Sequence, residues 1–398
     1  MKLLVVSSRF PYPVEKGDKL RLYNQLKILS KHFEVYLFSC TTSDIKEKSK
    51  KEIKKYCKEI EIYEIGNNEV ITNLTKAFFG GLPFQVGLYT NPTIRNRIKK
   101  MVKAQQIEHV YCQLIRMAEN VKYLNIPKTI DFMDAFGFGM EQRKQRGSIF
   151  SKWIYGQESK RTKKFEKNIY EYFGAHTIIT AQDRDRLPMK SEAVTVVQNG
   201  VNVKFFENKG FMEEYDLIFI GNMGYIPNVN AAKYLCEKIQ PAISKKANKE
   251  YSVFIAGARP TNEVIDLTKN EQVTVAGWLE DIRTGYEAGR YFVAPIFNGI
   301  GQQNKILEAL SMEKPCIINQ SVADGIGLIH EQHCLIANTV DEFVESILRL
   351  ENDPILLAKI IVNGKELVQN NFRWKQQTSK LIEVIKNNQK TGQKPSSL

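Results

Sequence analysis

Residues 215–239 read YDLIFIGNMGYIPNVNAAKYLCEKI, and this stretch decides the fold class. Its start, Tyr215–Ile220, is mostly apolar, β-branched or aromatic, which predicts a buried strand. A glycine-containing loop follows, and residues 231–239 then have the apolar spacing of a helix. A buried strand followed directly by a helix is the unit from which parallel α/β sheets are built.

The same alternation extends along the chain in both directions. In the first half, strands are predicted at 3–6, 35–38, 60–65, 109–112, 128–131, 176–180 and 194–198, with helix-length segments between most of them. Beyond the polar stretch 207–214, further strands are predicted at 252–256, 273–276, 291–294 and 316–318. The sequence therefore predicts an α/β protein of two doubly wound, Rossmann-like domains that face a central cleft.

Basic residues are concentrated in the first half of the chain. The 398 residues carry a formal net charge of +13. Residues 1–200 hold 35 Lys+Arg and 21 Asp+Glu, whereas residues 201–398 hold 22 and 23. This asymmetry indicates an anionic partner for the first domain: nucleic acid, an anionic membrane surface or a phosphorylated substrate. A well-solvated surface is the simpler alternative.

The composition is typical of a globular protein, with 43% hydrophobic and 25% charged residues. No apolar run approaches the ~18 residues of a membrane-spanning helix, and the apolar run at 3–6 is too short for a signal peptide. The six cysteines are scattered without metal-ligand spacing. We therefore expect reduced thiols in a cytoplasmic protein.

The loop after the first strand is one candidate site. Residues 7–21 read SSRFPYPVEKGDKLR and join a buried strand to a helix. Gly17 permits close backbone approach, and Asp18 is placed to cap the helix. Lys19 and Arg21 on the first turn favour an anion such as phosphate. A proline-rich loop before an ordinary capped helix is an equally good interpretation of these residues alone.

The second candidate loop, residues 294–315, reads APIFNGIGQQNKILEALSMEKP. A strand enters a glycine-containing loop, and a helix begins at about Gly301–Asn304, so its amides offer donors to a phosphate. Lys305 adds a full charge, and Glu308 lies one turn further on the same face. A carboxylate there is suited to accept hydrogen bonds from a vicinal diol, so the pattern favours a nucleotide. An ordinary salt bridge between Lys305 and Glu308 is the alternative.

Several motifs follow one another in the second half of the chain: Asn199–Asn202 with Phe205, Phe219–Ala231, Gly277–Ile282, Asn304–Leu310 and Pro315. In this order they resemble family 4 retaining glycosyltransferases of the GT-B fold. The opening residues Phe10–Pro13 and Lys16–Arg21 are similar to the branch associated with bacterial exopolysaccharide synthesis. The resemblance extends over nearly the whole chain, to about Trp374.

The resemblance implies roles for individual residues. Lys305 would contact the donor diphosphate, with Gly17 and Asp18 in the loop that approaches it, and these three form the expected catalytic set. Glu308 would bind the ribose hydroxyls. The remaining donor-binding residues that we expect are Asn298, Gly299, Gly301, Gln303, Asn304, Gly221 and Asn222.

The chain departs from the broad family at three places. Ile300 occupies the position of a glutamate eight residues before Glu308. Residues 222–228 lack the arginine and lysine that often follow the first strand of the second domain, and Gly17-Asp18 replaces a common glycine pair. The exopolysaccharide-associated branch shares these changes, so they do not predict an inactive protein.

Acceptor-side candidates lie in the first domain. Asp131 and Asp134 end a predicted strand that faces the expected cleft, although a helix cap explains either carboxylate equally well. Arg116 is a similar candidate, and Lys19 and Arg21 complete the set. The D-x-D at Asp183–Asp185 is a weak metal signal because a helix is expected to begin there. We expect no metal and no cofactor, since the nucleotide sugar is a substrate.

The segments 95–103 and 143–167 are rich in Lys and Arg, and in the second segment Phe150, Trp153 and Tyr155 lie among the basic residues. This pattern is compatible with an anionic membrane surface that carries a lipid-linked acceptor. It also matches nucleic-acid binding, and a solvated helix face explains either segment alone. Because both segments belong to the basic half, we favour the membrane surface and expect no nucleic-acid partner.

The sequence thus predicts a glycosyltransferase that moves a sugar from a nucleotide-diphosphate donor to a glycan or lipid-linked glycan during cell-surface polysaccharide synthesis. We expect a cytoplasmic protein that can also lie peripherally on the inner face of the cell membrane. The expected parts are an acceptor-side domain (1–198), a nucleotide-sugar domain (199–372), a helix returning to the first domain (373–388) and a disordered tail (389–398). A non-catalytic module that binds polyanions and a sugar-nucleotide epimerase remain the alternatives.

Overall fold

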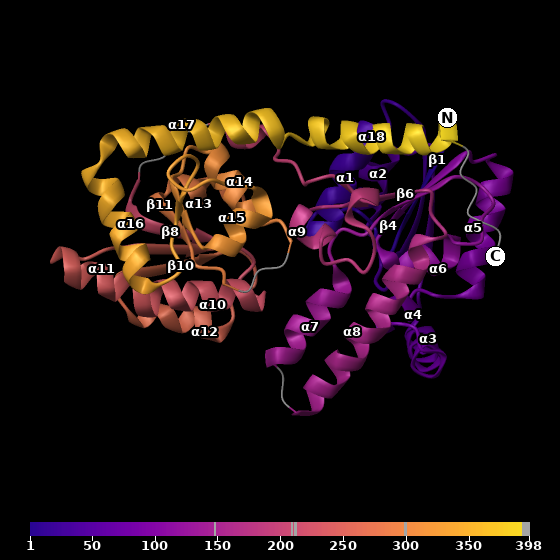
Figure 1. Cartoon of the computed structure of the whole chain (residues 1–398), viewed down its shortest axis with the longest axis horizontal. Coiled ribbons are helices and arrows are strands. Elements are labelled where there is room, and N and C mark those ends of the chain that lie inside the picture. The colour runs from indigo at the N-terminus through magenta and orange to yellow at the C-terminus, as the bar shows by residue number, and fades with distance from the viewer. Residues whose placement is uncertain (147–148, 208–209, 211–212, 298–300, 392–398) are drawn as a thin grey trace. The chain divides into compact units, whose positions relative to one another are not determined.

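A computed structural model describes residues 1–146, 149–207, 210, 213–297 and 301–391. The chain divides into two compact units. The N-terminal unit comprises Met1–Gln198 together with the segment from Trp374 onward, and the C-terminal unit comprises Asn199–Arg373 (Figure 1). Each unit contains one parallel sheet with helices packed on it. The α/β class with two Rossmann-like domains is therefore confirmed.

The sheet of the N-terminal unit has the strand order β3-β2-β1-β4-β5-β6-β7, with all neighbours parallel. The order reverses between β1 and β4, where the loops that leave the two strands diverge. Its strands are β1 (Lys2–Ser7), β2 (Glu34–Thr41), β3 (Glu59–Glu64), β4 (His109–Gln113), β5 (Lys128–Asp131), β6 (Ala175–Ile178) and β7 (Thr195–Val196). Its helices are α1 (Gly17–Leu29), α2 (Glu47–Lys54), α3 (Asn67–Gly80), α4 (Phe84–Gly87), α5 (Pro92–Ala104), α6 (Ala118–Val121), α7 (Phe136–Arg146), α8 (Ile149–Tyr170), α9 (Ala181–Arg184) and α18 (Trp374–Thr391).

Strand β1 shows why the predicted apolar run forms a central strand. Leu3 and Val5 belong to one hydrophobic cluster, and Leu4 and Val6 belong to another. Because successive side chains of a strand point to opposite faces, the sheet must be covered on both sides. Helices α1 and α18 contribute to the first cluster and α5 to the second.

Helix α18 joins the N-terminal unit although it follows the C-terminal unit in sequence. Its residues Leu381, Ile382 and Ile385 lie in the same cluster as Leu22 and Leu26 of α1. The helix continues to Thr391, so residues 389–391 are helical and not part of a tail as expected. The remainder of the expected tail, 392–398, lies outside the described residues.

The C-terminal unit repeats the architecture with the strand order β10-β9-β8-β11-β12-β13, again parallel throughout. The order reverses between β8 and β11. Its strands are β8 (Tyr215–Ile220), β9 (Val253–Ala256), β10 (Val273–Gly277), β11 (Gly289–Ala294), β12 (Cys316–Ile318) and β13 (Leu335–Ile336). Its helices are α10 (Ile226–Tyr234), α11 (Gln240–Ala247), α12 (Asn262–Ile265), α13 (Ile282–Glu287), α14 (Asn304–Ser311), α15 (Gln320–Ile326), α16 (Val340–Asn352) and α17 (Pro354–Asn371).

Helix α10 begins at Ile226, five residues before the predicted start at 231. Pro227 lies in the first turn, where its fixed φ suits a helix and its missing N–H has no intrahelical partner to lose. The predicted loop is therefore too long at its C-terminal end, because Pro227 belongs to the first turn of the helix. The shift brings Asn228 onto α10, where it takes part in the candidate site.

All six cysteines are buried and free of disulfides. Within the described ranges, no helix is long and apolar enough to span a bilayer.

Candidate functional site

The candidate donor site lies where the strand order of the C-terminal unit reverses. Strands β8 and β11 are adjacent and parallel, so the loops that leave them begin at the same sheet edge. The β8 loop contains Gly221 and Asn222, and the β11 loop leads into α14. Asn298 and Gly299, both expected to bind the donor, lie outside the described residues, as does Ile300.

Two neutral amide groups hold the Lys305 ammonium. Nζ donates to Oδ1 of Asn228 and to Oε1 of Gln303, at 2.9 Å each. Asn228 is oriented in turn because its Nδ2 donates to the carbonyl of Asn222 at 2.9 Å. Burial lowers the pKa of Lys305 to about 8, while the charge of Glu308 acts in the opposite direction. The ammonium is thus fixed in place by groups that do not neutralise its charge.

Gly221 is required by the packing around Lys305. A Cβ atom at this position would lie 2.8 Å from Asn228 Nδ2 and 3.2 Å from Lys305 Cε. Any side chain would therefore displace the amide that orients the ammonium. Gly257, at the end of the neighbouring strand β9, has φ +137°, and a Cβ there would lie 1.6 Å from the Gly221 carbonyl oxygen. The two glycines let the strand ends approach each other closely.

Glu308 is held by a tyrosine and does not pair with Lys305. The hydroxyl of the fully buried Tyr286 donates to Glu308 Oε2 at 2.7 Å. Burial raises the pKa of Glu308, while this hydrogen bond and the charge of Lys305 lower it. Among the described residues the Lys305–Glu308 salt bridge is not formed. Glu308 Oε1 thus makes no hydrogen bond within the described chain.

The helix start adds backbone donors beside Lys305. Gly301 has φ +71°, in the left-handed region that favours glycine, and α14 begins at Asn304. The first amides of a helix point toward the loop that precedes it and favour an anion. Asn304 Oδ1 accepts from Asn199 Nδ2 at 3.4 Å, and Asn222 Oδ1 accepts from the Gly224 amide at 3.0 Å. The Asn304 and Asn222 side chains therefore stabilise the loops and do not hold the Lys305 ammonium.

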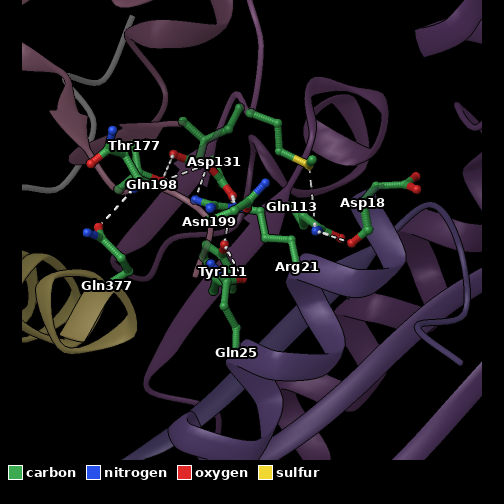
Figure 2. A network of polar contacts seen from close by, with 12 residues as sticks. Asp18, Arg21, Gln25, Tyr111, Gln113, Asp131, Thr177, Gln198, Asn199 and Gln377 are labelled. Atoms are coloured by element: carbon green, nitrogen blue, oxygen red, sulfur yellow. Dashed lines mark hydrogen bonds and ion pairs between the residues drawn. The ribbon is translucent and has the colours of Figure 1, made fainter. Parts of the chain in front are cut away.

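In the N-terminal unit, two arginines converge on Asp18 at the start of α1. Arg9 Nη1 lies 2.7 Å and Arg116 Nη1 lies 3.6 Å from Asp18 Oδ2. Gln113 Nε2 donates to the Asp18 carbonyl at 2.9 Å (Figure 2). Asp18 is expected in the catalytic loop and Arg116 on the acceptor side, and the structure brings the two side chains together. The sequence gives no signal for Arg9, because nothing local indicates its partner. Gly17 begins α1, and a Cβ there would meet nothing within 4 Å.

Arg21 and Asp131 differ from the expectation of acceptor-binding side chains. Both side chains are 0% exposed, and Arg21 Nε lies 2.7 Å from Asp131 Oδ2. Figure 2 shows the pair surrounded by Tyr111 and Thr177. The Tyr111 hydroxyl donates to Asp131 Oδ2 and that of Thr177 to Oδ1, at 3.0 Å each. The arrangement has the form of a buried structural ion pair that joins α1 to the sheet, because no part of either side chain reaches solvent.

Of the two carboxylates that we expect on the acceptor side, Asp131 is buried in the ion pair and Asp134 is partly exposed. Within the described chain the Asp134 carboxylate makes no hydrogen bond. Burial and then the charge of Asp183 raise the pKa of Asp134 to about 7; Asp131 acts in the same direction and Arg21 and Arg116 oppose it. Lys19 is also partly exposed. Thr180 is the N-cap of α9: its hydroxyl accepts from the Asp183 amide and donates to the Asp183 carboxylate. In the described ranges no cluster of metal-ligating side chains is found.

Replacing Asp134 with asparagine is expected to make stability less dependent on pH. The folded pKa of about 7 lies above the ordinary value near 4, so the folded protein holds the proton more tightly. The contribution of Asp134 to wild-type stability should therefore fall as pH rises from about 4 to 7. The difference in melting temperature, variant minus wild type, should increase between pH 5 and pH 8. Glu166, whose pKa burial also raises to about 7, is present in both proteins. If the difference in melting temperature does not change with pH, the pKa of Asp134 is not raised in the folded protein.

Known proteins share both the domain and the fold. Residues 214–353 match the family model described as glycosyl transferases group 1. A 44.6 kDa protein of the cps region of Klebsiella pneumoniae is 22% identical over 93% of this chain and 96% of its own length. Sucrose-phosphate synthase from Thermosynechococcus elongatus is 14% identical, with a TM-score of 0.70 over 97% of this chain and 99% of that one. Anabaena HepE, solved in complex with UDP, is 12% identical, with a TM-score of 0.68 over 97% and 100%. These likenesses confirm the GT-B fold.

Proposed function

We propose that this chain, a glycosyltransferase with a group 1 domain at residues 214–353, transfers a sugar from a nucleoside-diphosphate donor to a glycan or lipid-linked glycan. One observation carries the proposal: the Lys305 ammonium is fixed at the start of α14, one turn before Glu308. A diphosphate would accept from the ammonium and the α14 amides. The open oxygen of Glu308 would accept from a ribose hydroxyl.

The chemistry follows from where charge develops. The bond between the anomeric carbon and the diphosphate oxygen breaks, and the electron pair leaves with the diphosphate. Lys305 and the α14 amides are placed to stabilise that charge without first reorganising. The acceptor oxygen bonds to the anomeric carbon, and its proton can leave with the diphosphate. Retention of anomeric configuration is part of the proposal because Asn304–Leu310 and Pro315 resemble retaining family 4 enzymes.

The product is proposed to be a cell-surface polysaccharide. The similarity to a protein of the Klebsiella cps region supports this role. The complex of HepE with UDP supports a uridine nucleotide as the first donor to test. The same proposal includes catalytic roles for Gly17 and Asp18. It also includes acceptor binding by the N-terminal unit.

A thermal-shift series with UDP, GDP, ADP and their sugars tests the donor. We expect one base family to stabilise the protein, by about 2.7 kcal/mol when the ligand is at 100 times its Kd. Glu308→Gln should reduce that stabilisation, because an amide accepts hydrogen bonds from a ribose less strongly than a carboxylate does. A series without any shift would favour the polyanion-binding module, and conversion of the free nucleotide sugar without acceptor would favour the epimerase.

We further propose that the N-terminal unit contacts an anionic membrane surface from the cytoplasmic side. Trp153 is 60% and Phe79 is 82% exposed. A cavity of about 540 Å³ lies between α3, α4 and α8, and its lining includes Phe78, Trp153 and Arg161. Exposed aromatic rings beside basic side chains suit the interface of an anionic bilayer.

Sedimentation with lipid vesicles tests this contact. The protein should sediment with phosphatidylglycerol vesicles and stay in solution with phosphatidylcholine vesicles. Trp153→Ala should weaken the association several-fold, whereas Tyr225→Ala, which changes an exposed aromatic side chain of the C-terminal unit, should not. Equal sedimentation with both lipids, or equal loss in both variants, would contradict the proposal.

A further inference from the structure

A second cavity of the N-terminal unit has the features of an anion site. It measures about 540 Å³ and lies among the loops that follow β1 and β2. These strands are parallel neighbours, so α1 and α2 both begin at the same edge of the sheet. The cavity is lined by Ser8, Arg9, Phe10, Tyr12, Pro13, Glu15, Lys16, Lys19, Thr41–Lys46, Ser49, Leu88 and Tyr89.

A lysine occupies the N-cap position of both helices that begin at this cavity. Lys16 precedes α1, and Lys46 precedes α2. Lysine cannot cap a helix because its ammonium has no hydrogen-bond acceptor. A cation is also unfavourable at the positive end of a helix dipole. The same unfavourable choice at two adjacent helix starts indicates that the site serves another purpose.

The charges nearby leave the cavity positive. Its lining carries Arg9, Lys16, Lys19 and Lys46 against Glu15 and Asp44. The acidic residues in the first turns of the two helices are already engaged. Asp18 accepts from Arg9 at 2.7 Å, and Glu47 accepts from Lys50 at 2.6 Å. Each of these two carboxylates thus already has a basic partner of its own.

A buried hydroxyl without a partner lies in the same lining. Ser8 is 2% exposed, and within the described chain its Oγ makes no hydrogen bond. A buried polar atom that lacks a partner is costly, so its retention calls for a ligand atom to satisfy it. A hydroxyl donates readily to a phosphate or carboxylate oxygen.

We propose that this cavity binds an anionic group, a phosphate or a carboxylate, of the acceptor glycan. Lys16, Lys46 and the two helix starts supply the positive field, and Ser8 supplies a hydrogen bond. The inference rests on the proposed function, because it treats the bound anion as part of an acceptor. It narrows the acceptor class from glycans in general to charged ones.

Titration calorimetry of the full chain at low salt tests the inference. The probes are glucose 1-phosphate, glucuronate, glucose and inorganic phosphate. We expect glucose 1-phosphate or glucuronate to bind at least about tenfold more tightly than glucose, and more tightly than inorganic phosphate. A preference between the first two identifies a phosphate or a carboxylate as the recognised group.

The variant K16A/K46A removes both N-cap charges and should weaken binding of the preferred probe by about tenfold. Lys51 and Lys54 are exposed on α2 and do not line the cavity, so K51A/K54A is a control with the same change in charge. It should change the affinity by less than about twofold. Ser8→Ala should weaken binding without any change in charge.

Three results would overturn the inference: no preference for charged sugars, equal weakening in K16A/K46A and the control, or loss of nucleotide stabilisation in K16A/K46A. The last result would assign the cavity to the donor. Failure of the proposed function is seen separately, in wild-type protein that no nucleotide or nucleotide sugar stabilises.

Discussion

Lys305→Ala is expected to reduce turnover by about 10²- to 10³-fold, the loss typical of removing one preorganised group that stabilises developing negative charge. The ammonium is held by Asn228 and Gln303, so it is in position before the diphosphate begins to leave. Its loss should act mainly on kcat, because the charge on the diphosphate grows in the transition state. Release of the nucleoside diphosphate in the presence of acceptor measures the effect.

Two further variants separate catalysis from folding. Lys238→Ala removes an exposed lysine of the same unit and should leave turnover unchanged. Asn228→Ala keeps the ammonium but removes one of the two groups that hold it. Its turnover should therefore lie between the turnover of wild type and that of Lys305→Ala. Melting temperatures should show that Lys305→Ala is folded. A folded Lys305→Ala protein with turnover within about threefold of wild type would exclude the proposed role.

The alternation of apolar strands and helices predicts every strand of the two sheets except the two-residue edge strand β13, because central strands such as Leu3–Val6 must be apolar on both faces. The same pattern indicated the donor loop, since a ligand site lies where parallel strands end and the strand order reverses. Lys305 and Glu308 could be singled out because they share a helix, where spacing along the sequence fixes the side-chain geometry.

The partners of these residues could not be predicted in the same way. Asn228 and Tyr286 are 77 and 22 residues away from the side chains that they contact. Their positions depend on how whole helices pack on the sheet, and hydrophobic periodicity does not specify that. The start of α10 at Ile226 could not be predicted either. The neighbouring residues do not distinguish a proline in the first turn of a helix from a proline in a loop.

Arg21 shows the strongest conflict between sequence pattern and structure. A charged residue near the start of a helix, as Arg21 is in α1, is normally exposed. Its burial is possible because Asp131, 110 residues away, supplies the opposite charge. Burial alone would lower the pKa of Arg21, but Asp131 raises it above the ordinary value. The pair therefore stays ionised inside the fold, and each charge depends on the other.

Removing one member of this pair should have the largest effect on stability. Arg21→Ala and Asp131→Asn are each expected to lower the free energy of unfolding by about 3–5 kcal/mol, because each leaves an unpaired charge or unsatisfied donors in the interior. Denaturant unfolding measures the loss. Lys50→Ala breaks an exposed pair with Glu47 and should have no measurable effect.

The double variant Arg21→Met with Asp131→Leu distinguishes a structural ion pair from a substrate site. Removing both charges relieves the cost of an unpaired ion, so the double variant should regain part of the stability that each single variant loses. Recovery should be incomplete because the Tyr111 and Thr177 hydroxyls lose the carboxylate that accepts from them. If Asp131 instead bound the acceptor, the double variant would be as inactive as Asp131→Asn, and Asp131→Asn would remain stable while its KM for the acceptor rose. That outcome would assign Arg21 and Asp131 to the acceptor site. It would also show that their ion pair is not what holds α1 on the sheet.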